Sequence, residues 1–131
     1  MKEITVNTSR RMEFVVLDNE VQQTVAESGI QEGCVVIYCP HTTAALTINE
    51  NADPSVVHDI LKTTENLVPP HAGYTHSEGN SDAHIKSSMF GPSLTIPVTG
   101  GRLQQGTWQG IFFCEFDGPR RRKVWIQTIG Q

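Results

Sequence analysis

Short runs of alternating hydrophobic and polar positions dominate the N-terminal part of the chain, and they predict two strands followed by a helix. The strands are expected at residues 4–7 and 12–17. The helix is expected at residues 19–28, because Asp18 is a suitable N-cap residue and Gly29 is a residue that typically ends a helix.

Two further strands and a second helix are predicted in the middle of the chain. The run 33–39 is continuous and β-branched, which indicates a strand covered on both faces, and residues 44–49 form another strand candidate. Asp53 and Pro54 open the second helix, since Asp is a good N-cap and Pro is tolerated at the first helical position.

The phase of the second helix separates its apolar from its polar side chains. The apolar face carries Val56, Val57, Ile60, Leu61 and Leu67, and the polar face carries His58, Asp59 and Lys62. The helix should end before Pro69, and residues 69–83 then form a loop long enough to suggest a function. A short helix is expected at 84–89 and a strand at 94–98.

The C-terminal third predicts a β-hairpin. Residues 107–116 and 121–129 read as two strands around the turn 117–120. Counting outward from this turn pairs Asp117 with Arg120 and Glu115 with Arg122 across the hairpin. Both faces of the hairpin are apolar in the middle, so we expect its own domain and a second subunit to cover them.

Length and charge restrict the function classes. The 131 residues predict one domain, and the net charge of −4 argues against a nucleic-acid-binding protein. The N-terminus lacks the apolar core of a signal peptide, and no apolar run is long enough to span a membrane. The odd cysteine count, Cys34, Cys39 and Cys114, predicts free thiols in a cytoplasmic protein rather than a disulfide framework.

Histidines are the most informative candidates for chemistry. His76 and His84 lie in the polar stretch 76–93, and His41 ends an apolar run. Imidazole is a good ligand for zinc, and a catalytic zinc usually has three protein ligands, so these histidines are candidates for a divalent metal site. Their spacing matches no known motif, and ordinary surface histidines remain the alternative.

Carboxylates supply the candidate acid–base groups. Glu50 follows a strand and has no evident structural role, whereas Asp53 has the role of a helix cap. Glu115 lies in an apolar run and must be paired if it is buried. Pairing with Arg122 and direct use in a site are equally compatible with that position.

Basic and small polar residues supply a candidate anion site. Arg120 and Arg122 could bind phosphate, because the planar guanidinium group matches phosphate oxygens. Ser88 and its neighbours could add hydroxyl and backbone donors. A solvated hairpin tip is the alternative, since no nucleotide-binding glycine motif is present.

Three stretches of the chain resemble the hallmark blocks of the YjbQ-like family, which is also called secondary thiamine-phosphate synthase. They read HTTAALTINENADPSVV, HSEGNSDAHIKSSMFGPSLTIPV and GTWQGIFFCEFDGPRRR. The resemblance covers nearly the whole chain. It implies a compact α+β domain over residues 1–131, with a mixed β-sheet or sandwich, two main helices and the C-terminal hairpin.

The resemblance also implies a homotrimer, with a site for a metal ion or an anion where subunits meet. The matching positions are His41, His76, His84, Glu50, Asn80, Trp108, Gln109, Glu115 and Arg120. We expect the three histidines to hold zinc, Glu50 or Glu115 to act in acid–base chemistry, and the remaining polar residues to bind a phosphate.

The expected activity is that of an enzyme on small phosphorylated metabolites, with a thiamine-phosphate-synthase-like transferase reaction as a side activity. The dedicated synthases are (β/α)₈ barrels of roughly 200 residues or more, which this chain cannot form. A metal-dependent hydrolase and a non-catalytic trimeric metabolite-binding protein are the alternatives.

Overall fold

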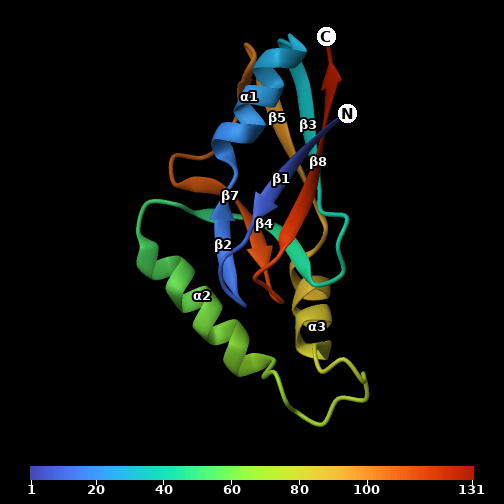
Figure 1. Cartoon of the computed structure of the whole chain (residues 1–131). Coiled ribbons are helices and arrows are strands. Elements are labelled where there is room, and N and C mark those ends of the chain that lie inside the picture. Colours follow the sequence, from blue (N-terminus) through green and yellow to red (C-terminus); the bar gives the residue numbers. More distant parts are fainter.

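Eight strands form two antiparallel sheets that pack against each other, and three helices lie around them (Figure 1). The computed structural model describes residues 1–131. The five-stranded sheet contains, in spatial order, β1 (Lys2–Asn7), β8 (Arg121–Gly130), β3 (Glu32–Tyr38), β5 (Ser93–Thr99) and β6 (Arg102–Leu103). The three-stranded sheet contains β2 (Glu13–Val16), β7 (Gln109–Glu115) and β4 (Ala44–Glu50) in that order. The helices are α1 (Asp18–Ser28), α2 (Pro54–Leu67) and α3 (Ser81–Phe90).

The main core lies between the two sheets and under α1. Val35 and Ile37 of β3 face Phe113 of β7 there, together with Val21 of α1, and all four are fully buried. Each such side chain contributes about 1.5–3 kcal/mol through the hydrophobic effect. A second, smaller cluster covers the other face of β7, where Phe112, Cys114 and Phe116 meet Ala45 and Ala83. Strand β7 is therefore apolar on both faces because it is the central strand of a sheet covered on both sides.

The predicted C-terminal hairpin does not form. Strand β7 pairs with β2 and β4, whereas β8 pairs with β1 and β3 in the other sheet. Glu115 lies opposite Glu13 and Ala44, so its contact with Arg122 is not a cross-strand pair. Every pairing is antiparallel, so the sheets are not mixed in strand direction.

Strand β3 is covered on one face only, contrary to the prediction. Its inward side chains are buried, but Cys34 and Val36 on the outer face are half-buried and Tyr38 is 42% exposed. The ring of Tyr38 stacks on Trp125 of β8 with centroids 5.9 Å apart. An apolar surface therefore remains on the outside of the larger sheet.

The first two helices begin and end close to the predicted residues. Gly29 ends α1 in the left-handed conformation, with φ of 75°. Asp18 does not cap α1, because it is the first helical residue and its carboxylate accepts the backbone N–H of Ile111 at 2.8 Å. Asp53 caps α2, accepting the backbone N–H of Ser55 at 2.9 Å, with Pro54 in the first turn.

Helix α2 runs along the outside of the molecule (Figure 1). Only Thr64 is buried, and Leu67, which the helical phase placed on the core face, is 69% exposed. The helix has no sheet to pack against along most of its length, so its apolar face is only half covered. No helix of the protein has the length and hydrophobicity needed to cross a membrane.

A buried ion-pair network connects α2 to α3. Lys86 is fully buried, and its ammonium group donates to Asp82 and to Glu65, each at 2.8 Å. Arg11, from the loop between β1 and β2, also pairs with Glu65 and lies 3.5 Å from Asp82. The network holds α3, and with it His84, in a fixed place against the sandwich.

Candidate functional site

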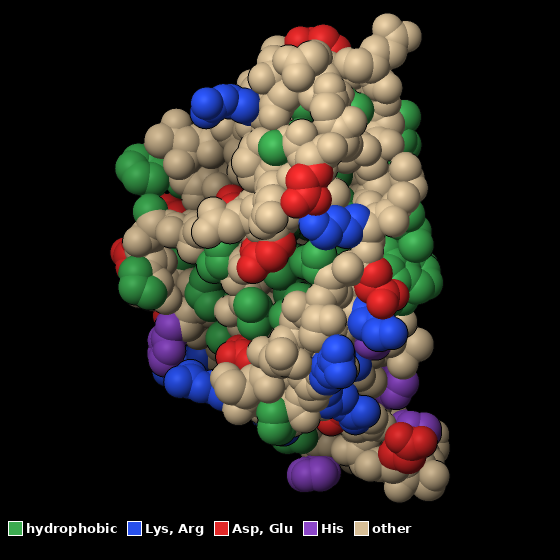
Figure 2. All heavy atoms as spheres, turned by 45° about the horizontal axis from the view of Figure 1, so that its top comes forward, with side chains coloured by type: hydrophobic (Ala, Val, Ile, Leu, Met, Phe, Trp, Pro, Cys, Tyr) green, Lys and Arg blue, Asp and Glu red, His purple; other side chains and the backbone are tan.

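All three histidines line one polar cleft, here called the histidine–arginine cleft. It has a volume of about 410 Å³ and lies where β3, β4, β8 and the start of α3 come together. Its walls consist of Pro40, His41, Thr42, Thr43, His76, Glu78, Asn80, His84, Arg120 and Arg122. Figure 2 shows basic side chains and histidines gathered at the lower end of the face that it displays. The sequence-based expectation that the histidines converge is therefore met.

His76 and His84 form a close imidazole pair. His84 lies in the first turn of α3, and His76 precedes that helix by five residues. Their ring centroids are 5.4 Å apart and the rings are nearly perpendicular, at 89°. Both imidazoles can therefore contact the same ligand group.

His41 is held in one tautomer by the backbone of β8. Its Nε2 atom accepts the backbone N–H of Lys123 at 2.9 Å, so the neutral ring carries its proton on Nδ1. Burial, followed by the positive charge of Arg122, lowers the pKa of His41 below its usual value. His41 is therefore a neutral hydrogen-bond donor at physiological pH, suited to an oxygen atom of a ligand.

Arg122 and Glu115 form a buried pair beneath the cleft. Arg122 Nε donates to Glu115 at 2.9 Å, Nη2 also contacts Glu115, and Nη2 donates to Thr43 Oγ1 at 2.9 Å. The carboxylate further accepts the hydroxyl of Thr8 at 2.7 Å and the backbone N–H of Asp117 at 3.1 Å. Glu115 is fully buried, satisfied and absent from the cleft wall, so this geometry favours a structural role over the expected acid–base role.

Asp117 orients two residues of the cleft. Its side chain accepts hydrogen bonds from Arg120 Nη2 at 2.7 Å and from Asn80 Nδ2 at 2.8 Å. The predicted pairing of Asp117 with Arg120 is thus present. The remaining amide oxygen of Asn80 is buried and has no partner among the protein's own groups. Asn80 lines the cleft, so an acceptor that no protein group uses lies in its wall.

A second hollow adjoins the cleft. It has a volume of about 330 Å³, and it shares His41, Thr42 and His84 with the cleft. Its other walls are Ala44, Ser87, Ser88 and Pro92. The Ser88 hydroxyl donates to the carbonyl of His84 at 2.9 Å. The predicted phosphate ligand Ser88 therefore lies in the adjoining hollow rather than in the cleft itself.

Two of the expected site residues lie elsewhere. Glu50 and Gln109 face each other in the β4–β7 ladder. Six residues of β4 separate Glu50 from Ala44, which at about 3.3 Å per residue amounts to roughly 20 Å. The Gln109 side chain accepts the backbone N–H of Gly106 at 2.8 Å. Within one chain, neither residue takes part in the cleft.

The cleft does not contain a complete set of protein ligands for a metal. No group of three or more His, Cys, Asp or Glu side chains is arranged to hold an ion. His76 and His84 have a suitable separation, since two imidazoles on one tetrahedral zinc have centroids about 5 Å apart, given Zn–N distances of about 2.0–2.1 Å. The ring nitrogen of His41 that accepts from Lys123 is not free to join them.

Several lining residues were not singled out from the sequence. Thr42 and Thr43 follow His41 directly, and their position beside a candidate ligand is a signal that could have identified them. Glu78 belongs to the polar stretch that contains His76. Ser87 is one of the neighbours of Ser88 that were expected to add hydroxyl donors, and it lies in the wall of the adjoining hollow.

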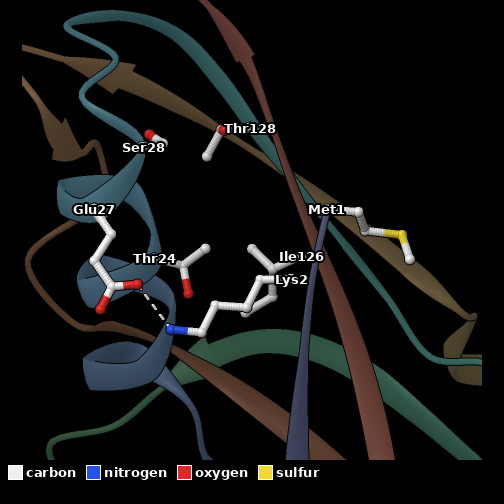
Figure 3. Close-up of a pocket in the computed structure, with 7 residues that line it drawn as sticks. All are labelled: Met1, Lys2, Thr24, Glu27, Ser28, Ile126 and Thr128. Atoms are coloured by element: carbon white, nitrogen blue, oxygen red, sulfur yellow. Dashed lines mark hydrogen bonds and ion pairs between the residues drawn. The ribbon is translucent and has the colours of Figure 1, made fainter.

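Another hollow lies between α1 and the strands β1 and β8 (Figure 3). Lys2 and Glu27 form an ion pair of 2.9 Å across it. The hydroxyls of Thr24 and Ser28 both donate to carbonyls of their own helix. None of the predicted site residues lines this hollow, and its polar groups already have partners.

Comparison with known proteins gives a consistent result. A family model described as UPF0047 protein YjbQ-like matches residues 2–131. The UPF0047 protein MJ1081 of Methanocaldococcus jannaschii is 53% identical over 125 residues, covering 95% of this chain and 91% of that protein. The UPF0047 protein YugU of Bacillus subtilis is 48% identical over 131 residues, covering 99% of each.

Solved structures have the same fold. A conserved protein of the yjbq/upf0047 family from Clostridium acetobutylicum, described as uncharacterized, superposes with a TM-score of 0.97 at 50% identity, covering 98% of this chain and 100% of that one. A protein of unknown function from Sulfolobus solfataricus, SSO2532, gives a TM-score of 0.95 at 34% identity, with 99% and 96% coverage.

Proposed function

The chain belongs to the YjbQ-like UPF0047 family, and we propose that it is an enzyme that acts on small phosphorylated metabolites in the histidine–arginine cleft. The observation that carries this proposal is the convergence of Arg120, Arg122 and three histidines on a cleft in which Pro40 is the one apolar lining residue. Guanidinium groups match phosphate oxygens in shape and charge, and imidazoles can donate to the same oxygens or transfer protons.

The arginines are fixed in position before any ligand arrives. Asp117 holds the guanidinium of Arg120, and Glu115 together with Thr43 holds that of Arg122. The N–H groups outside these bonds, including Nη1 of Arg122, are then available to a ligand without further ordering of the side chain. Such fixed donors in a partly enclosed site are the usual basis of electrostatic stabilisation in phosphate chemistry.

The proposed roles follow from these positions. Arg120, Arg122 and Asn80 bind the phosphate, and His41 donates from Nδ1 to an oxygen that gains negative charge. The imidazoles of His76 and His84 carry or accept the proton. A transferase reaction of the thiamine-phosphate-synthase type, with pyrophosphate as the leaving group, is the side activity that fits such a site.

Zinc is a second candidate occupant, favoured by the spacing of His76 and His84. In this alternative the protein is a metal-dependent hydrolase, and the two imidazoles hold the ion together with oxygen atoms of the substrate. The metal would supply a polarised phosphate or an activated water.

A homotrimer in the cytoplasm is the proposed assembly and location. The exposed stack of Tyr38 on Trp125 supports a subunit contact on the outer face of the larger sheet. Free thiols at Cys34, Cys39 and Cys114 support a reducing compartment. Glu50 and Gln109 can join a cleft only as part of a neighbouring subunit, which would reconcile their expected role with their position.

The proposal is tested by titrating the protein with inorganic phosphate and pyrophosphate in a calorimeter. We expect binding that weakens at least tenfold in Arg120→Gln. Arg102→Gln is the matched control, because Arg102 is an exposed arginine on β6 outside the cleft, and its affinity should be unchanged. Equal affinity in the wild type and Arg120→Gln would refute the assignment.

Turnover separates the enzyme from the binding-protein alternative. Incubation with a pyrimidine diphosphate and a thiazole phosphate should release pyrophosphate, and the release should stop in His84→Ala. Thermal stabilisation by these ligands without any turnover would support a non-catalytic metabolite-binding protein instead.

A further inference from the structure

We propose that the natural ligand is an organic phosphate with two parts, whose phosphate occupies the histidine–arginine cleft and whose uncharged body occupies the adjoining hollow against Ser87. This inference rests on the proposed function and extends it to the class of substrate. The proposal excludes inorganic phosphate, pyrophosphate and other phosphates without an organic body as the natural ligand.

The two hollows adjoin each other at shared side chains. His41, Thr42 and His84 form walls of both, so a single molecule can extend from one to the other past the imidazoles. Their volumes, about 410 and 330 Å³, are each typical of a site for a small organic molecule rather than a bare ion. A ligand that filled only the cleft would leave the second hollow unused.

The chemistry of the two hollows differs. The cleft contains both arginines, and Pro40 is its one apolar lining residue, so its walls suit a phosphate. The adjoining hollow contains no Asp, Glu, Lys or Arg side chain, and it adds Ala44 and Pro92 to two serines. Its walls suit an uncharged ring or short chain that carries one or two hydrogen-bonding groups.

Unpaired buried polar atoms point to the same ligand. Three buried side-chain nitrogen or oxygen atoms have no partner among the protein's own groups, and they belong to Asn80, Ser87 and Gln105. Asn80 lines the cleft and Ser87 lines the adjoining hollow, whereas Gln105 lines neither. Buried polar groups without partners are rare in folded proteins and require a reason. A ligand that spans both hollows would explain two of these three unpaired atoms, those of Asn80 and Ser87.

Ser87 is the residue that distinguishes this ligand from phosphate alone. It is buried in α3, one turn after Ala83, and its hydroxyl bonds to no protein group. A hydroxyl without a partner does not stabilise the fold, since its burial is unfavourable unless it is hydrogen-bonded. Removing it should therefore leave stability unchanged or raised, while weakening any ligand that bonds to it.

The test compares four probes by calorimetry: inorganic phosphate, phenyl phosphate, and the two phenyl phosphates that carry a hydroxymethyl group at the meta or the para position. We expect phenyl phosphate to bind at least tenfold more tightly than inorganic phosphate. One of the hydroxymethyl isomers should gain a further factor of about 3 to 10, the usual strength of one added hydrogen bond.

In Ser87→Ala, the favoured hydroxymethyl isomer should bind no more tightly than phenyl phosphate, and the affinities for the other probes should not change. The midpoint of thermal unfolding should be unchanged or higher. Ser28→Ala is the matched control, because the Ser28 hydroxyl already has a partner in the Val25 carbonyl of its own helix and lies outside both hollows. It should keep the wild-type order of affinities.

The outcomes separate the two proposals. If no probe binds, the proposed function fails. If all four probes bind with equal affinity, the phosphate site stands and the second hollow is not part of it. If Ser87→Ala lowers the thermal midpoint, Ser87 has a structural role and the present inference is overturned.

Discussion

Arg122 of β8 and Glu115 of β7 form a salt bridge that joins the two sheets, with both side chains buried. The pair was expected as neighbours across a hairpin, but the two strands belong to different sheets. The salt bridge therefore does not stabilise a hairpin. It fixes how one sheet packs against the other at the base of the cleft.

Removing one partner of this pair should be strongly destabilising. Glu115→Ala would leave the Arg122 charge buried without compensation, and we expect a loss of about 3–5 kcal/mol in the free energy of unfolding. The double variant Glu115→Leu with Arg122→Met should lose clearly less, since it leaves no buried charge. Urea denaturation monitored by tryptophan fluorescence measures both.

The pair of Arg120 with Asp117 provides the control. The Arg120 side chain is about half exposed, so Arg120→Ala should cost about 1 kcal/mol or less. A comparable loss for Arg120→Ala and Glu115→Ala would show that burial does not set the strength of these pairs.

His41 should make stability depend on pH. Its pKa is lowered in the folded protein, mainly by burial, so the unfolded chain binds this proton more readily. The stability that the neutral ring contributes is fully present above pH 6.5 or so, which is about the pKa of the histidine in the unfolded chain. It is lost as the pH falls from there through the lower pKa of His41 in the folded protein. The fall in unfolding free energy between pH 7.5 and pH 5 should be smaller in His41→Gln than in the wild type. An identical fall in both would contradict this origin.

The three thiols should differ in reactivity. Burial raises the pKa of Cys39 to about 11 and that of Cys114 well above the usual value, so neither forms the reactive thiolate near neutral pH. Cys34 is half-buried on the outer face of β3. In the native protein, Ellman's reagent at pH 8 should label at most one cysteine quickly, and all three after denaturation without reductant. Recovery of only one thiol would reveal a disulfide.

Zinc binding to the cleft should depend on phosphate. Only His76 and His84 are placed as protein ligands, so oxygen atoms of a phosphate should raise the zinc affinity of the cleft. Equilibrium dialysis should give one zinc per chain, lost in His84→Ala. His58→Ala should retain it, because His58 lies on the exposed face of α2. Zinc content that does not differ between wild type and His84→Ala would exclude this site.

Assembly should depend on the outer face of the larger sheet. Light scattering should give about three times 14.5 kDa for the wild type, and a smaller species for Trp125→Glu. Leu67→Glu is a control, since Leu67 is an exposed apolar residue on α2, away from that face. A monomeric wild type would remove the support for a subunit contact here.

Local signals in the sequence predicted the elements well, but not the partners of each strand. Asp53 and Gly29 act within a few residues, so the limits of the first two helices follow from chemistry that is close in the chain. Strand pairing depends on contacts distant in sequence, and two adjacent apolar strands resemble a hairpin whether or not they pair.

The same limit applies to the site. The residue types identified His41, His76 and His84, whereas the exclusion of Glu50 and Gln109 from the cleft follows from the direction in which β4 runs.

The order of strand pairing has a consequence for biosynthesis. Strands β2 and β4 pair only with β7, and β1 pairs only with β8. While the ribosome adds residues at about 5–20 per second, these earlier strands therefore have no partner until β7 and β8 emerge. Arg120 and Arg122 emerge directly after β7. The nascent chain therefore exposes unpaired strand edges until the last residues that line the cleft have been made. We expect chaperones that bind extended apolar segments to recognise β2 and β4 during this interval, and to release them once β7 has been made.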